Sequence, residues 1–409
     1  MAQAARQPAA RRTLGGCCLA TFWSGAIAFG YPGIMGAYWQ QAFGATSAQT
    51  GLVVTLMLLG IALCTIVSGR FLERFGMRAC VATGTLLMVA ALAVLMAARG
   101  IGLVYAWAFL VSFGSSFVYG PGLTTVQRCL PARKGLASGL INVTFGLSAA
   151  LMSPVWEAML GSVGYGAVNA SLVVCIVVTN GAAWLLVGGD GTPVSAAAAS
   201  PSAAGTQAED GLTVAQAVPT RAFWLLWLAW AFVGAAGISM VSLAKSYSAF
   251  LGLSSVAMLT AFNITNGAGR LVAGLLCDAV GGELTALTAF AAMAAGYALL
   301  PLAPGVAGAA VLAACVGYGF GALFATCGPI ATRHFGMACF GRLFGFIFAA
   351  YGCVGGVIGP LLAGVVLASV ANPYPVVFGY LALFALVGAA AMALLRWEGP
   401  VEGRAARGR

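Results

Sequence analysis

The chain has 409 residues, of which 61% are hydrophobic and only 7% are charged. A soluble globular protein carries about 25% charged residues, so this chain is predicted to be an integral membrane protein whose surface mostly faces lipid. That composition excludes a cytosolic enzyme, a secreted disulfide scaffold and a nucleic-acid-binding protein. We interpret the net charge of +10 as a signal of membrane topology, because the basic residues fall between apolar runs.

Twelve apolar windows of about 20 residues, the length of a membrane-spanning helix, follow one another along the chain. They lie at roughly 14–38, 50–69, 79–98, 102–126, 136–159, 166–187, 222–244, 254–276, 284–303, 306–330, 342–368 and 374–395. The predicted fold is therefore an all-α integral membrane protein. A β-barrel would instead show spans of about ten residues with alternating polarity.

One break in the apolar pattern divides the chain into two halves. Residues 188–220 are rich in Ala, Ser, Gly and Pro and contain three acids, which predicts a flexible cytoplasmic linker. We expect an N-terminal six-helix half at 1–187 and a C-terminal half at 221–409 that ends in a short cytoplasmic tail. The basic N-terminus resembles the start of a signal peptide, but no convincing cleavage site follows, so it is read as leading into a retained first helix.

The basic residues predict the orientation in the membrane. If both termini are cytoplasmic, sixteen of the 19 basic residues lie on the cytoplasmic side, Arg99 and Lys245 lie outside, and Arg270 lies within a helix. Such an excess follows the positive-inside rule. We expect a multi-pass protein of the bacterial inner membrane with both termini in the cytoplasm.

Groups that could hold a metal or perform acid–base catalysis are scarce. The only histidine is His334, in a predicted loop, and the 11 cysteines form no CxxC pair or cluster with metal-ligand spacing. We expect no cofactor, no metal and no enzymatic activity. The expected partners are the lipid bilayer and a small organic anion, without nucleic acid, and the chain is expected to be a monomer.

The two halves carry a repeated pattern. A glycine, an acid and a second glycine recur 205 residues later, and one arginine recurs at the same shift. The pairs are Gly69 and Gly274, Glu73 and Asp278, Gly76 and Gly281, and Arg128 and Arg333. Two six-helix repeats, with a site between them near the membrane midplane, are typical of secondary transporters.

The first copy of this pattern runs Gly69, Glu73, Arg74, Gly76 and Arg78. It resembles the loop motif of the major facilitator superfamily, with Glu where Asp is usual. The glycine lets helices approach closely, and the acid can pair with an arginine or cap a helix N-terminus. These residues are interpreted as a latch that closes the cytoplasmic side. The alternative is a solvated loop of mixed charge.

The stretch from Arg128 to Gly139, together with Val118-Tyr119-Gly120 and Gly146, resembles the oxalate:formate antiporter family, which is related to the monocarboxylate transporters. The resemblance covers all twelve predicted helices and implies transport of small organic anions. Arg133, in this stretch, and Asp278, in the second copy of the repeat, are assigned to the same cytoplasmic latch as the first loop motif.

Two departures from these relatives bear on the substrate. Animal monocarboxylate transporters carry an Asp four residues before the arginine of helix 8, where this chain has Asn266, and a helix-1 Lys, which is absent between Thr13 and Tyr38. The oxalate exchangers carry a second cation in helix 11, whereas the matching region around Tyr351 has none. The missing second cation argues against oxalate.

Arg270 is the one basic residue well inside an apolar run. An arginine near the bilayer centre costs about 2.5–3.5 kcal/mol, so it should face the bundle interior. Helical spacing places Asn263, Asn266, Arg270 and Gly274 on one face. The guanidinium fork suits a carboxylate, so Arg270 is predicted to bind the substrate, with Asn266 sharing an oxygen. The alternative is an arginine that snorkels to the cytoplasmic headgroups.

A single intramembrane cation predicts a substrate with a single negative charge, such as lactate, pyruvate or formate, because an unneutralised second charge is costly in a low-dielectric cavity. Further candidate substrate ligands share a polar side chain on a predicted helix. They are Tyr119, Asn142, Tyr351, Tyr31 and Tyr318.

The coupling mechanism stays open between proton symport and anion exchange. The only other acid placed deep in an apolar run is Glu157, which is a candidate for titration. Alternative functions are an oxalate or dicarboxylate:formate exchanger, a multidrug exporter of the same fold, and a membrane sensor that binds a carboxylate without transporting it.

Overall fold

The computed structural model describes residues 2–187, 211–251, 255–337 and 340–398, and within them the regular secondary structure is helical. Ten helices of this described part are long and apolar enough to cross a membrane. One of these, α3, is broken in the middle at Gly76 and supplies two spans, and α10 adds another helix of spanning length. The prediction of twelve helices is confirmed. Residues 188–210 of the predicted linker lie outside the described residues.

Contacts divide the chain into two units. The N-terminal unit comprises Met1–Ala132, Thr144–Asp210 and Phe340–Phe346, and the C-terminal unit comprises Arg133–Val143, Gly211–Cys339 and Ile347–Arg409. The first ten residues of α5 (Lys134–Ser162) therefore pack with the C-terminal unit, although they precede the linker in the sequence.

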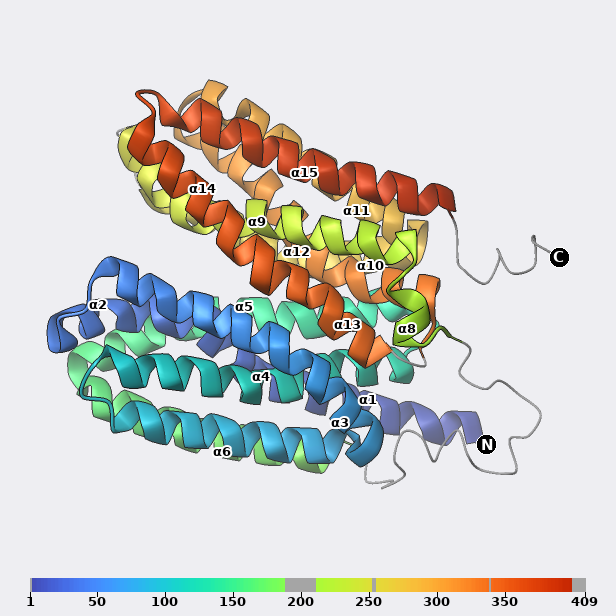
Figure 1. Ribbon diagram of the computed structural model, residues 1–409. Coiled ribbons are helices and arrows are strands. Elements are labelled where there is room, and N and C mark those ends of the chain that lie inside the picture. Colours follow the sequence, from blue (N-terminus) through green and yellow to red (C-terminus); the bar gives the residue numbers. More distant parts are fainter. Residues whose placement is uncertain (1, 188–210, 252–254, 338–339, 399–409) are drawn as a thin grey trace. The chain divides into compact units, whose positions relative to one another are not determined.

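The N-terminal unit is a bundle of long helices (Figure 1). Its elements are α1 (Ala2–Gly25), the π-helical segment η1 (Ala26–Gly30), α2 (Tyr31–Phe43), α3 (Ser47–Met96), α4 (Ile101–Cys129), most of α5, α6 (Gly164–Leu186) and the start of α13 (Phe340–Ala349). A capping box begins α3, in which the Thr46 hydroxyl accepts from the Gln49 N–H at 3.2 Å and the Gln49 side chain accepts from the Thr46 N–H at 2.8 Å. Two amide groups that the first helical turn leaves free are satisfied in this way.

The C-terminal unit is a second helical bundle, in which α12 packs on both α10 and α11, and α15 packs on α9 and α11. Its elements are α8 (Val214–Ala217), α9 (Arg221–Phe250), α10 (Ser255–Val280), α11 (Gly282–Leu299), the 3₁₀ segment η3 (Leu300–Leu302), α12 (Gly305–Phe335), the π-helical segment η4 (Ala350–Gly355), α14 (Gly356–Ser369) and α15 (Pro373–Glu398).

The repeated glycines adopt the same unusual backbone conformation. Gly76 has φ 78° and ψ 174°, and Gly281 has φ 95° and ψ 150°. A side chain is strained at these angles, so glycine is required at both positions. The repeat in the sequence therefore marks two equivalent bends, one between the second and third spans and the other between α10 and α11.

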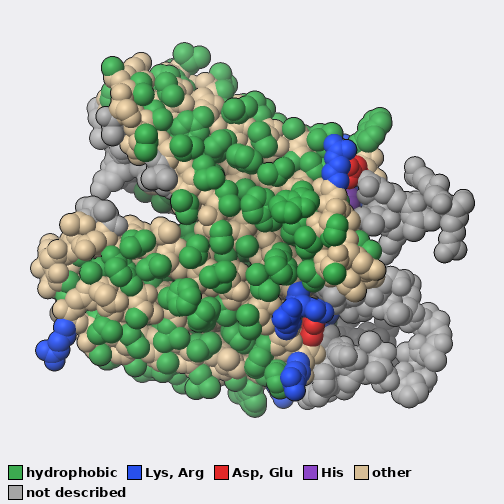
Figure 2. Space-filling model, viewed as in Figure 1, with side chains coloured by type: hydrophobic (Ala, Val, Ile, Leu, Met, Phe, Trp, Pro, Cys, Tyr) green, Lys and Arg blue, Asp and Glu red, His purple; other side chains and the backbone are tan. Residues whose placement is uncertain are grey.

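The surface of the helices is apolar. Leu86 and Leu185 are each 70% exposed, and Val178 is 64% exposed. Hydrophobic side chains cover most of the face drawn in Figure 2, and charged side chains are few and lie near helix ends. Exposed apolar area of this extent is what contact with lipid requires, and it would be a liability in water.

Candidate functional site: a buried arginine in the C-terminal unit

Arg270 lies in the middle of α10, and only 1% of the residue is exposed. Its Nη1 donates to the backbone oxygen of Asn142 at 3.0 Å, and its Nη2 donates to Oδ1 of Asn266 at 3.4 Å. The guanidinium therefore ends inside the C-terminal unit and does not snorkel to lipid headgroups. Asn266 lies one helical turn from Arg270, as its spacing predicts.

An aromatic ring covers the guanidinium. The Cζ atom of Arg270 lies 4.4 Å from the ring centroid of Phe324, on α12. Phe324 in turn packs against Trp230 and Tyr351, with ring centroids 5.2 Å and 5.5 Å away. A cation over a ring face is attracted by the ring quadrupole, and the apolar surroundings strengthen electrostatic interactions at this point. Sequence reasoning missed Phe324, because a phenylalanine in an apolar run gives no local signal.

Tyr351 is fully buried in η4, and its hydroxyl has no hydrogen-bond partner among the described residues. The Tyr351 ring and the Arg270 guanidinium both lie against Phe324. Burying an unsatisfied hydroxyl costs about 1–3 kcal/mol, and π-helical segments occur often at functional sites. Tyr351 is therefore a buried hydroxyl donor without a partner among the described residues, beside the ring that covers the guanidinium.

Asn142 joins this site through its backbone. Its side-chain amide donates to the backbone oxygens of Ser138 at 2.8 Å and Phe324 at 3.1 Å, and its own carbonyl accepts from Arg270. The amide thus connects α5 to α12. In this conformation the amide N–H groups are used by the protein itself.

The remaining predicted ligands are distributed over both units. In the C-terminal unit, Tyr318 packs against Gly269, next to Arg270 in the sequence, and Asn263 is exposed. In the N-terminal unit, the Tyr31 hydroxyl donates to the side-chain oxygen of Asn169, and the Tyr119 ring lies 4.5 Å from that of Phe145. Of the predicted ligands, the C-terminal unit brings Arg270 together with Asn266, Asn142 and, through Phe324, Tyr351.

Glycines on α12 set the distance between α12 and α10. A Cβ atom placed on Gly321 would overlap the backbone oxygen of Asn266, and one placed on Gly317 would overlap the backbone oxygen of Phe262. We expect Gly321→Val to force the helices apart, lower the free energy of unfolding by about 1–3 kcal/mol and reduce transport, because Phe324 is moved off Arg270. Thermal unfolding and uptake assays measure the two effects. Gly379→Val on α15 is the control, since nothing lies within 4 Å of that position; equal effects of both substitutions would contradict this account.

The first loop motif holds α3 to the start of α13 within the N-terminal unit. Glu73 pairs with Arg342, with Oε2 and Nη2 3.3 Å apart, and a Cβ atom on Gly69 would lie 2.6 Å from the carbonyl carbon of Gly341. Glycine is needed at position 69 because the two backbones touch.

The two arginines of the motif make different contacts within the same unit. Arg78 donates from Nε to the Val187 oxygen at 2.9 Å and lies over the Trp184 ring, while Arg74 lies over the Phe75 ring at 5.2 Å. Within the described residues, neither arginine forms an ion pair with an acid. Arg78 therefore ties the loop between the second and third spans to the end of α6, whereas the Arg74 contact stays within the loop.

The second loop motif caps the start of α5. The two carboxylate oxygens of Asp278 accept from the backbone N–H groups of Gly135 at 2.7 Å and Leu136 at 2.8 Å. A carboxylate at a helix N-terminus is stabilised by the free amides and by the helix dipole. The exposed Arg133 lies just before α5, and its carbonyl accepts from the Ala137 N–H at 3.0 Å.

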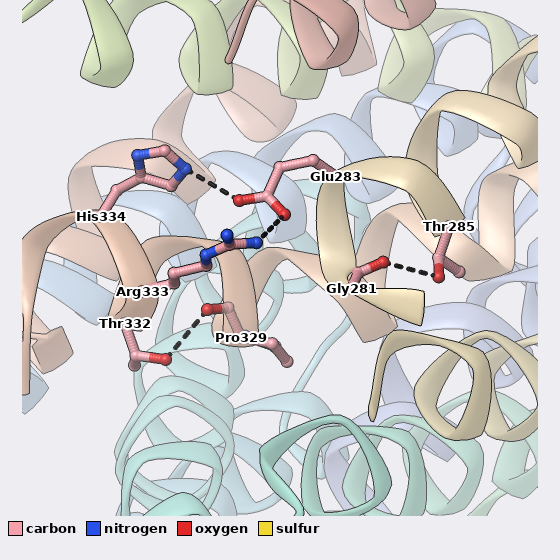
Figure 3. Close-up of polar contacts among 7 residues, drawn as sticks. All are labelled: Gly281, Glu283, Thr285, Pro329, Thr332, Arg333 and His334. Carbon is pink, nitrogen blue, oxygen red and sulfur yellow. Dashed lines mark hydrogen bonds and ion pairs between the residues drawn. The ribbon is translucent and has the colours of Figure 1, made fainter. Parts of the chain in front are cut away.

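An ion cluster around the buried Glu283 lies where the start of α11 meets the end of α12 (Figure 3). Arg333 Nη1 lies 2.8 Å from one oxygen of Glu283, and His334 Nε2 lies 2.9 Å from the other. The expectation that His334 lies in a loop was wrong, because it belongs to the last turn of α12 and is 2% exposed. Glu157, expected to be a deeply placed acid, is exposed, whereas Glu283 is buried.

Comparisons with known proteins agree with this architecture. The family model described as Major Facilitator Superfamily matches residues 17–360 and 257–409. The chain is 26% identical over 294 residues to the oxalate:formate antiporter of Oxalobacter formigenes, which covers 69% of this chain and 67% of the relative. It is 25% identical over 336 residues to the uncharacterized MFS-type transporter YhjX of Escherichia coli, which covers 77% and 80%.

The fold is shared with a solved transporter. The crystal structure of the transporter FucP in the outward conformation superposes with a TM-score of 0.70, covering 93% of this chain and 98% of FucP, at 16% sequence identity. At this identity the likeness concerns the fold alone.

Proposed function

The chain belongs to the Major Facilitator Superfamily, and on that premise we propose that it carries small monocarboxylate anions, such as lactate, pyruvate or formate, across the membrane by alternating access. A chain of this superfamily is a multi-pass membrane transporter and not an enzyme. The substrate, the coupling and the residues that perform them are the proposed part.

One observation carries the proposal, namely the buried guanidinium of Arg270 with polar partners and an aromatic cover. Its planar fork can hold both oxygens of a carboxylate, and burial strengthens the attraction. Asn266 and the unsatisfied hydroxyl of Tyr351 supply further polar groups in the same unit. Tyr119, Tyr31, Tyr318 and Asn263 stay predicted ligands.

A single negative charge suits the site better than two. Two other arginines of the described C-terminal unit are already paired with acids, Arg221 with Glu398 and Arg333 with Glu283, which also binds His334. Arg270 is the cation in the middle of a spanning helix, so a dicarboxylate would bring a second charge without a partner from these groups. The likeness to an oxalate:formate antiporter supports a small carboxylate and keeps dicarboxylate exchange as the alternative.

The direct test is uptake by proteoliposomes of radiolabelled formate, lactate, pyruvate and oxalate, each against an internal chloride or carboxylate load. We expect uptake of at least one monocarboxylate that exceeds uptake of oxalate. Empty liposomes and liposomes with the Arg270→Gln variant are the controls. Uptake of none of the four acids by the wild-type protein would contradict the proposal.

The same liposomes separate the two coupling mechanisms. Exchange predicts uptake that is accelerated by an internal anion and indifferent to an imposed pH difference, whereas symport predicts the reverse. Because Asn266 stands where related transporters carry an acid, we expect exchange, which needs no titratable residue at the site.

The loop motifs are proposed to act as the cytoplasmic gate. The pairing of Glu73 with Arg342 and the capping of α5 by Asp278 are contacts that a change of conformation can break and remake. With this assignment, both termini are proposed to lie in the cytoplasm, and the distribution of basic residues supports that orientation.

A further inference from the structure

The start of α5 is fastened to the C-terminal unit at two levels. At its N-terminus the carboxylate of Asp278 accepts from Gly135 and Leu136. Farther along the same helix, the Asn142 carbonyl accepts from Arg270, and the Asn142 amide donates to the Phe324 carbonyl. We call these contacts of residues 134–143 the α5 clasp.

Glycines bring α5 and α10 into backbone contact between these two levels. A Cβ atom on Gly139 would lie 3.0 Å from the Arg270 oxygen, and one on Gly274 would lie 2.5 Å from the Gly135 oxygen. The first turns of α5 therefore lie directly on the C-terminal half of α10. Beyond Val143, the rest of α5 packs with the N-terminal unit, so the clasp ends where the helix passes from one unit to the other.

The clasp occupies the guanidinium that the proposed function needs. Arg270 is 1% exposed, its face is covered by Phe324, and its two terminal nitrogens donate to Asn142 and Asn266. Asn266 belongs to α10 and moves with Arg270. The Asn142 carbonyl belongs to a different helix, so its bond to Arg270 is the one that a movement of α5 would release.

We propose that Asn142 is a positioning residue whose backbone carbonyl holds Arg270 when no substrate is bound, so that a carboxylate and the α5 clasp compete for the same guanidinium. The inference rests on the proposed function, in which Arg270 is the carboxylate ligand. A charge-assisted bond to a carboxylate is stronger than one to a neutral carbonyl. Substrate binding therefore releases α5 at the Arg270 level, while the Asp278 cap and the Asn142 amide bond to Phe324 still hold the segment.

Linkage makes the competition reciprocal. If the substrate loosens the clasp, then loosening the clasp by mutation must tighten binding of the substrate by the same factor. If the Asn142 amide were itself a substrate ligand, its loss would weaken binding of the substrate, which is the opposite result. General damage to the site would also weaken binding.

Two variants weaken the clasp and keep Arg270. Asn142→Ala removes the amide bond to Phe324, and Asp278→Asn removes the charge at the α5 N-terminus. We expect each to bind formate or lactate roughly 2- to 10-fold more tightly, the equivalent of one hydrogen bond. We also expect KM to fall with the tighter binding. We expect kcat to fall as well, because the weakened α5 contacts re-form less readily in each transport cycle. Isothermal titration of the purified full chain with the sodium salts, against sodium chloride, measures the affinity.

Hydrogen–deuterium exchange on the unmodified protein supplies a second measurement. Formate or lactate should speed exchange at the amides of residues 134–143 and should have no such effect in Arg270→Gln. If no carboxylate of the panel binds the wild type, the proposed function fails. If a carboxylate binds but both clasp variants bind it equally or more weakly, or exchange in residues 134–143 is unchanged or slower, the clasp inference is overturned while the proposed function stands.

Discussion

Replacing Arg270 with Gln is expected to abolish carboxylate uptake while the protein still folds and reaches the membrane. Gln keeps a polar side chain but removes the charge and the fork that the proposal assigns to the substrate. Truncating one partner of a buried charged pair costs about 2–5 kcal/mol, which is roughly a 30- to 5,000-fold loss of affinity. Counterflow of labelled formate or lactate in proteoliposomes measures the loss.

Two further variants define the cause of that loss. Arg270→Lys keeps the charge without the fork and should retain an intermediate activity. Arg99→Gln removes one positive charge from an exposed position between α3 and α4 and should transport at the wild-type rate. Uptake by Arg270→Gln at the wild-type rate would show that the carboxylate is held by another group.

Replacing Glu283 with Ala is expected to destabilise the C-terminal unit. The substitution removes the shared partner of Arg333 and His334 and leaves the imidazole, whose side chain is 1% exposed, without its acceptor. The side chain of Arg333 is 53% exposed and can be hydrated, so most of the cost comes from the His334 side. We expect a loss of about 2–3 kcal/mol, seen as a melting temperature lower by roughly 5 °C or more.

Glu157→Ala is the matched control for this substitution. Glu157 is an exposed acid near the end of α5, so its removal should change the melting temperature by less than about 2 °C, as most surface substitutions do. A double variant, Glu283→Ala with His334→Phe, should recover part of the loss because no polar imidazole is left buried. An equal melting temperature for Glu283→Ala and the wild type would refute the structural role of the cluster.

The spans and the repeat were predictable because they depend on properties of the sequence alone. Each apolar window is long enough to cross the bilayer, and the backbone must be helical there because lipid offers no hydrogen-bond partners. Gly76 and Gly281 could be recognised as a pair because a bend with positive φ requires glycine in both halves. The prediction erred locally for His334, because a polar residue near a helix end is compatible with either a loop or a last turn.

For the candidate site, the sequence determined the depth of Arg270 and its neighbour Asn266, because a helix fixes which residues lie one turn apart. Only the tertiary structure decided that the guanidinium bonds the carbonyl of Asn142, 128 residues away in the chain, and lies under Phe324. The same holds for Glu283 and His334, which are 51 residues apart. Contacts of this kind depend on how helices pack through their glycines and side chains, and helical periodicity within one segment carries no information about the partner helix.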